Sequence, residues 1–174
     1  MSVAQFNVLT SPLVMPLSYF SSKDLSLAGG KGANLGQLLQ GGFEVPPGFV
    51  ITTAAYDLSL QQNGAQTRLL EIIRSLDVDN QDATAKVSQQ IHNLFQEIAI
   101  PGQLKDEIIK AYHQLEASAV AVRSSATAED LPEAAFAGQQ ETFLNVVGED
   151  ALMNAVRACW DSLWSERAIL YRAR

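Results

Sequence analysis

The sequence predicts an α+β fold with some α/β character, and three observations lead to this class. Short apolar runs typical of buried strands alternate with longer segments in which apolar residues recur at helical spacing. Of the 174 residues, 47% are hydrophobic and 18% are charged, a balance typical of a globular chain and unlike that of a disordered one. No stretch approaches the roughly 20 consecutive apolar residues that a membrane span requires. We therefore expect one folded unit without membrane contact.

The first third of the chain is predicted to contain two short strands and one helix. Residues 14–19 and 49–52 are short apolar runs, typical of strands. Between them, residues 21–30 are predicted to form a polar loop that ends in glycine. Residues 32–40 have helical spacing of leucines, and Gly41-Gly42 would end that helix, as a glycine pair after the last turn does.

Four helices are expected in the middle of the chain. Each predicted start has a residue that suits a helix N-terminus, either a polar cap or a proline whose missing N–H costs nothing there. Each is followed by apolar residues at helical spacing, which form an amphipathic stripe. The predicted starts are Thr53, Thr67, Asp82 and Pro101.

The last third changes character and is predicted to hold two strands and a helix. Residues 118–122 and 142–146 are expected to be strands, and the segment from Arg123 to Gln140 to be a loop between them. From Asp150 onward, apolar residues recur along one face of what is expected to be a single long helix.

Charge and cysteine content limit the function classes. Twelve basic and 19 acidic residues give a formal net charge of -7, which argues against general nucleic-acid binding but not against a local anion site. The single cysteine, Cys159, excludes an intrachain disulfide and cannot form a zinc site alone. The first 20 residues lack the basic start and cleavage pattern of a signal peptide, so we expect the protein to be cytoplasmic.

The first candidate site is the run Gly29-Gly30-Lys31-Gly32. Glycines at a helix start let the backbone come close to a phosphate, the helix offers free N–H groups, and lysine adds positive charge. The run is not a Walker A motif, because Leu25 replaces its first glycine and Gly32 follows the lysine. The alternative is an ordinary loop with a solvated lysine.

The second candidate is Arg123, which leaves a predicted buried strand and is followed by the hydroxyls of Ser124 and Ser125. A guanidinium can hold phosphate oxygens in a bidentate way, and ligands of α/β folds gather at the carboxyl ends of strands. The alternative is an ion pair with a nearby acid of the following loop. The candidates for that pair are Glu129, Asp130 and Glu133.

Two further groups of residues could bear on function. The small-residue loop around Gly138 could close over a ligand, or could be a simple connecting turn. His92 and His113 have no ligand-spaced partners, so we expect surface or half-buried histidines and no metal site in this chain.

Taken together, three segments resemble a known family. AGGKGANLG at residues 28–36, VPPGFVITT at residues 45–53, and the block from Ala121 to Arg172 with AVRSSATAEDLPEAAFAGQQETFLNV are similar to the N-terminal ATP-binding domain of the phosphoenolpyruvate synthase (pyruvate, water dikinase) family. The resemblance covers most of residues 20–172, and the helical middle is its least diagnostic part. Rifamycin phosphotransferases share these motifs.

The resemblance implies the N-terminal lobe of an ATP-grasp type domain with a helical insertion. Lys31 matches the family's lysine on the ATP phosphates, and Arg123 matches its arginine on the transferring phosphoryl group; both would be catalytic. Ala137, Gly138 and Gln139 match the loop that covers the phosphates, and Ser124 and Ser125 would support them. The implied cofactors are ATP and Mg²⁺, with the Mg²⁺ ligands on a following lobe.

The implied domain plan is a lead-in over residues 1–20 and one lobe over residues 21–174. A second lobe, a phospho-histidine domain and a pyruvate-binding barrel are expected to lie outside this chain, so pyruvate would be reached only through them. The chain alone would then be inactive. Two alternatives stay open: the ATP-binding lobe of an antibiotic phosphotransferase of the rifamycin type, and a non-catalytic fragment that keeps only the fold.

Overall fold

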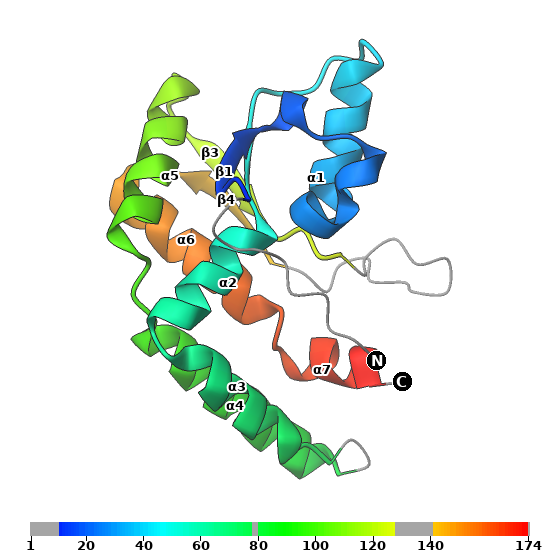
Figure 1. Ribbon diagram of the computed structural model, residues 1–174, viewed down its shortest axis with the longest axis vertical. Coiled ribbons are helices and arrows are strands. Elements are labelled where there is room, and N and C mark those ends of the chain that lie inside the picture. The colour runs from blue at the N-terminus through cyan, green and yellow to red at the C-terminus, as the bar shows by residue number, and fades with distance from the viewer. Residues whose placement is uncertain (1–10, 78–79, 128–140, 174) are drawn as a thin grey trace.

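A computed structural model describes residues 11–77, 80–127 and 141–173 of the chain. Within these ranges the strands are β1 Val14–Pro16, β2 Phe49–Ile51, β3 Val120–Arg123 and β4 Thr142–Val146. The α-helices are α1 Leu25–Gln40, α2 Thr53–Gln62, α3 Ala65–Arg74, α4 Gln81–Glu97, α5 Gly102–Gln114, α6 Glu149–Ser162 and α7 Glu166–Ala173. Two 3₁₀ turns, η1 Leu17–Tyr19 and η2 Ser22–Asp24, join β1 to α1 (Figure 1).

The described strands form two small antiparallel sheets, β1 with β2 and β3 with β4. In the first sheet Val14 lies opposite Ile51, and in the second Arg123 lies opposite Thr142. Helices outnumber strands and the strand pairs are antiparallel, so the class is α+β. The α/β character that the alternation suggested is not seen, because no described strands pair in parallel.

The larger of two apolar clusters lies where α4 and α6 pack together (Figure 1). Helix α6 also covers the β3–β4 sheet, and α3 packs along α4 to form a long hairpin. The apolar stripe predicted for residues 82–98 provides much of this cluster, because its large side chains are fully buried. They are Val87, Ile91, Leu94, Phe95 and Ile98.

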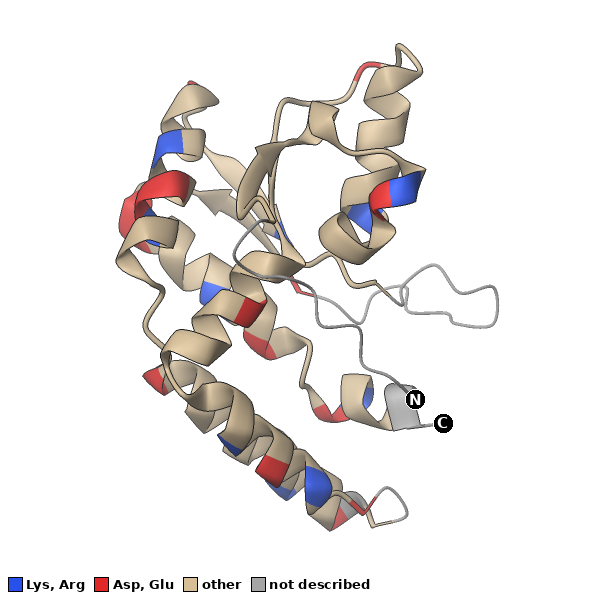
Figure 2. Ribbon diagram, viewed as in Figure 1, with Lys and Arg blue, Asp and Glu red and all other residues tan. Residues whose placement is uncertain are grey.

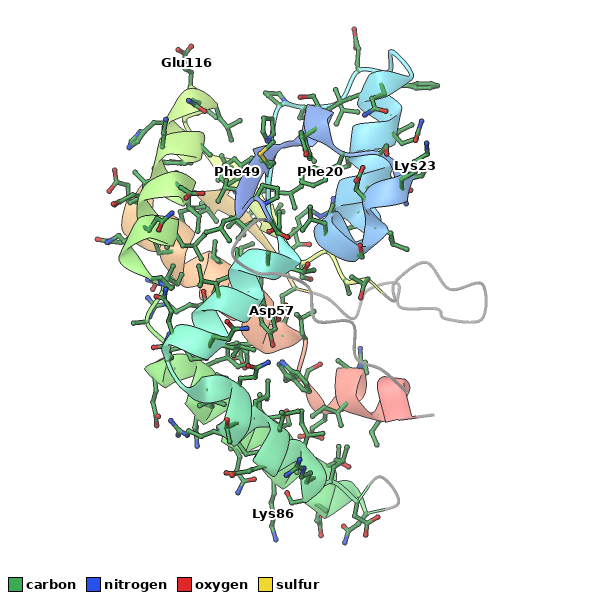
Figure 3. All side chains as sticks on the ribbon, viewed as in Figure 1. Phe20, Lys23, Phe49, Asp57, Lys86 and Glu116 are labelled. Atoms are coloured by element: carbon green, nitrogen blue, oxygen red, sulfur yellow. The ribbon has the colours of Figure 1, made fainter. Side chains whose placement is uncertain are left out.

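The smaller cluster holds α1 against η1 and β2. Phe20 is fully buried at its centre and points between β1 and α1 in Figure 3. The backbone of α1 passes very close to η1, since a Cβ on Gly36 would lie 2.2 Å from the carbonyl oxygen of Phe20. A side chain at position 36 would therefore push α1 away from its seat.

Charged residues lie on the outer surface. Acidic and basic residues are interspersed along the α3–α4 hairpin (Figure 2), and Lys86 and Glu116 point away from the protein in Figure 3. Both histidines are exposed, as expected: His92 pairs with Asp161, and Nε2 of His113 lies 2.8 Å from a carboxylate oxygen of Glu149. No described helix combines the length and the apolar character that crossing a bilayer would require.

Three predicted elements differ from the structure. The strand expected over residues 14–19 ends at Pro16, and Leu17–Tyr19 form the 3₁₀ turn η1. The loop expected over residues 21–30 is wrong, since α1 already begins at Leu25 and continues through a kink at Gly29. The single helix expected after Asp150 is divided: α6 ends at Ser162 and α7 begins at Glu166. The other helix starts lie within two residues of their predicted positions.

Candidate functional site

The glycine run forms a sharp kink inside α1. Gly29 has φ +68° and ψ 174°, a backbone conformation open to glycine but costly for residues with a Cβ. A Cβ on Gly29 would lie 2.1 Å from the carbonyl oxygen of Ser125. The segment that follows β3 therefore lies directly against the backbone of α1 at the kink.

The hydroxyl of Ser125 joins the two segments. It donates to the carbonyl oxygen of Ala28 at 2.8 Å and accepts from the amide of Gly32 at 3.0 Å. The amide of Gly30 also donates to the carbonyl oxygen of Ala126 at 2.9 Å. We call this contact between residues 28–32 and residues 123–126 the joint. Figure 1 shows the chain leaving β3 beneath the lower end of α1.

The amides of the glycine turn are bonded within the protein. The helix start was expected to offer free N–H groups to a phosphate, but those of Gly30 and Gly32 donate to Ala126 and Ser125. These two amides thus stabilise the protein itself. The positive charge of the turn comes from Lys31, the residue between Gly30 and Gly32 in the sequence.

Lys31 is half-buried, and its charge acts on Cys159 of helix α6. The pKa of the Cys159 thiol on α6 is raised to about 12, chiefly by burial and also by the charge of Glu141, while the charge of Lys31 acts to lower it. Both charges thus lie near the thiol. The thiol stays protonated at neutral pH, and it carries no charge that would compete with an anion for Lys31.

Arg123 occupies the last position of β3 and is exposed. It forms no ion pair with another residue of the described ranges. The next residue, Ser124, is buried, and its amide donates to the carbonyl oxygen of Glu141 at 3.5 Å, which continues the pairing with the chain entering β4. The guanidinium is therefore available to solvent beside the joint, and Figure 2 shows basic positions on both α1 and β3.

Several predicted residues lie outside the described ranges. Ala137, Gly138 and Gln139 are among them, so their assignment to the phosphate-covering loop stays a prediction. The same holds for the alternative partners of Arg123, which are Glu129, Asp130 and Glu133.

The sequence did not predict a further pair of contacts between α1 and the segment over residues 45–53. The hydroxyl of Thr53, at the start of α2, donates to the carbonyl oxygen of Ser26 at 2.9 Å. A side-chain methyl of Val50 lies 3.2 Å from where a Cβ on Gly32 would be. The segment VPPGFVITT thus supports the glycine turn. The sequence marked this segment only as part of the family resemblance, and nothing in the motif predicts that it contacts α1.

The donor set of the joint suits a phosphate chain better than a metal ion. An ammonium on one segment and a guanidinium on the other are the side chains that pair with phosphate oxygens. Across residues 11–77, 80–127 and 141–173, no three histidine, cysteine, aspartate or glutamate side chains gather into a cluster that could hold a metal ion.

Comparison with known proteins identifies the family. The family described as "Pyruvate phosphate dikinase, AMP/ATP-binding domain" matches residues 25–174, which include all of the joint. The chain belongs to this family. The resemblance found from the motifs is thereby confirmed, and the joint lies within a domain type named for binding adenine nucleotides.

The curated relatives are transferases that are much longer than this chain. A probable phosphoenolpyruvate synthase of Methanothermobacter thermautotrophicus is 46% identical over 155 residues, which is 86% of this chain and 23% of that protein. A rifampicin phosphotransferase of Bacillus subtilis is 42% identical over 164 residues, covering 93% of this chain and 19% of that protein. A phosphoenolpyruvate synthase of Helicobacter pylori is 43% identical over 164 residues, covering 88% and 20%. The chain thus spans less than a quarter of each relative.

Proposed function

We propose that this chain binds the phosphate groups of ATP at the joint, with Lys31 and Arg123 as the two cations. The observation that carries the proposal is the bond pair of Ser125, which brings together segments 93 residues apart in sequence, each bearing one of these cations. Phosphoryl transfer asks a protein mainly to position phosphates and to neutralise their charge. A lysine and an arginine held on adjoining backbone segments provide both.

We further propose that the protein is a phosphotransferase of the phosphoenolpyruvate synthase type. In that reaction the β-phosphoryl group of ATP passes to a histidine in another part of the protein and then to pyruvate. ATP, pyruvate and water give phosphoenolpyruvate, AMP and phosphate. The proposal is supported by family membership and by two relatives with this name at 43% and 46% identity. The proposal includes an ATP-grasp arrangement, in which a second lobe outside this chain completes the nucleotide site.

The remaining assignments belong to the same proposal. The loop with Ala137, Gly138 and Gln139 would cover the phosphates, and Mg²⁺ would be held by residues outside this chain. When bound, Mg²⁺ would neutralise charge on the phosphates. We place the reaction in the cytoplasm, because it draws on cellular ATP.

The second candidate is an antibiotic phosphotransferase. It is favoured by the 42% identity to the rifampicin phosphotransferase of Bacillus subtilis. Both candidates begin with the same step on ATP, so the role of the joint is the same in each. They differ in the acceptor, and ATP consumption that depends on pyruvate or on a rifamycin would separate them.

The site assignment is tested by ATP titration of Lys31→Ala and Arg123→Ala. Each substitution removes a charged hydrogen bond worth about 1.5–3 kcal/mol, so each should weaken ATP binding by about ten- to a hundredfold. Lys23→Ala is the matched control, because Lys23 is an exposed lysine on η2, one turn before α1. It should bind ATP as the unsubstituted protein does. Unchanged affinity in both site variants would overturn the assignment.

A further inference from the structure

Ser125 lies at the centre of the joint with its hydroxyl already engaged. The hydroxyl donates its one proton to the carbonyl oxygen of Ala28 and accepts from the amide of Gly32. A serine hydroxyl has one proton to donate, so none is left for a phosphate oxygen. An incoming anion would meet an oxygen lone pair at Ser125. The family resemblance grouped this residue with the phosphate contacts, but its geometry does not suit that role.

The bonds of Ser125 instead determine where Lys31 lies. The residues on either side of Lys31, Gly30 and Gly32, both donate their amides to the segment that follows β3. Arg123 is two residues before Ser125 on that same segment. The backbone segments that carry the two cations are therefore bonded to each other through Ser125, and the close approach at Gly29 leaves no space for the segments to move closer.

We propose that Ser125 is a positioning residue for ATP: it holds Lys31 in register with Arg123 and does not itself contact the nucleotide. This inference rests on the proposed function, since it concerns the affinity of the same site. It differs from direct binding in one measurable way. If Ser125 acts through Lys31, its removal has little further effect once Lys31 is gone.

A double-mutant cycle on ATP affinity tests this difference. The variants are Ser125→Ala, Lys31→Ala and the two combined, titrated with ATP. We expect Ser125→Ala to weaken binding about tenfold in the unsubstituted protein and less than about twofold in the Lys31→Ala background, because residues that act together are not additive. A similar loss in both backgrounds would show direct contact and would overturn the proposal. No loss in the unsubstituted protein would overturn it as well.

Ser88→Ala is the matched control for general destabilisation. The Ser88 hydroxyl is half-buried and donates at 2.9 Å to the carbonyl oxygen of Trp164, 76 residues away, so its removal also breaks a long-range bond to the backbone. Ser88 lies on α4, away from the joint. Its loss should lower the melting temperature without changing ATP affinity. If Ser125→Ala folds too poorly to titrate, Ser125→Cys keeps the size of the side chain with a much weaker hydrogen-bonding group. It should show the same non-additivity with a smaller loss.

Amide hydrogen exchange without nucleotide separates the two proposals. In Ser125→Ala, peptides covering residues 28–33 should exchange faster than in the unsubstituted protein and in Ser88→Ala. One outcome is faster exchange in Ser125→Ala together with unchanged ATP affinity in Lys31→Ala. It would mean that Ser125 holds the joint but that ATP binds elsewhere, so the proposed function would fail. Unchanged exchange would mean that Ser125 does not hold the turn, and the positioning role alone would fail.

Discussion

The joint and the α3–α4 hairpin are stabilised in different ways. In the hairpin, apolar side chains such as Leu69, Ile91 and Leu94 are buried with at most 5% of their surface exposed. In the joint, the Ser125 hydroxyl forms two hydrogen bonds to backbone groups, and one backbone amide bonds to a backbone carbonyl. The two segments lie so close that no space is left for a Cβ at Gly29.

This difference separates stability from function. Burial of apolar surface is non-directional, and it stabilises the hairpin without specifying the placement of any single polar atom. Hydrogen bonds are directional, and a close backbone approach tolerates little displacement. We therefore expect substitutions in the hairpin to change mainly the free energy of unfolding, and substitutions in the joint to change ATP binding as well.

Gly29→Ala should have the largest effect on both quantities. The new Cβ would be strained at φ +68° and would lie 2.1 Å from the carbonyl oxygen of Ser125. Strain and overpacking together should cost about 4 kcal/mol of unfolding free energy, and ATP binding should be lost because the turn moves. Urea unfolding and ATP titration measure the two effects.

Gly102→Ala is the control for the glycine substitution. Gly102 begins α5, and a Cβ there would meet no atom within 4 Å. Its stability should stay equal or rise by up to about 1 kcal/mol, because alanine restricts the unfolded chain. If Gly29→Ala behaved like Gly102→Ala, the close contact at the joint would not exist in solution.

Ile91→Ala should destabilise the α3–α4 hairpin without changing ATP binding. Ile91 is fully buried between α4 and its neighbours, so truncation should cost about 3 kcal/mol of unfolding free energy. ATP affinity should stay unchanged at temperatures where the variant is folded. Leu70→Ala, whose leucine on α3 is 51% exposed, should lose far less stability. A tenfold loss of ATP affinity in Ile91→Ala would contradict the separation of stability from function.

Cys159 should leave stability at neutral pH unchanged and affect it only at high pH. Its pKa is raised to about 12 from its usual value of 9.0, chiefly by burial. Below pH 9 the thiol is protonated in both the folded and the unfolded protein, so stability does not depend on it. Between pH 9 and 12 the unfolded protein loses this proton first, so the free energy of unfolding should fall as pH rises.

Alkylation provides a direct measurement on the same thiol. At pH 8 iodoacetamide should leave Cys159 unmodified in the folded protein and react with it in denaturant, because the thiolate is the reactive form. Ser75→Cys, on the exposed C-terminal end of α3, is the control and should react at once in the folded protein. Equal rates at both positions would show that Cys159 is not buried beside the joint.

Much of the fold could be predicted from the sequence because helical periodicity is local. The stripe over residues 82–98 identified both α4 and a large part of the core. Helix starts were less certain, since α4 is capped by Asn80 in place of Asp82. The kink at Gly29 hid the first turn of α1, because a glycine pair normally indicates a break. The last helix is divided at Leu163 to Ser165, where the Oγ of Ser165 accepts from the amide of Ala168 and caps α7. The apolar periodicity continues past this serine and so does not reveal the break.

The candidate site was only half predictable. Lys31 and Arg123 were found because their residue types and neighbours suit phosphate. Their meeting through Ser125 depends on a hydrogen bond between residues 93 apart, and no local signal encodes such a pair. For the same reason the sequence suggested that Ser125 supports the phosphates and that the turn offers free amides. In the structure the Ser125 hydroxyl donates to the carbonyl oxygen of Ala28, and the amides of Gly30 and Gly32 donate to the segment that follows β3.

The measurement that tests the central claim most directly is amide hydrogen exchange with and without ATP. ATP bound at the joint should slow exchange in peptides covering residues 28–33 and 123–127, and should leave the α3–α4 hairpin over residues 65–74 and 81–97 unchanged. The assignment of the phosphate site would be contradicted if saturating ATP slowed amide exchange in the hairpin and left the exchange rates of both joint segments unchanged.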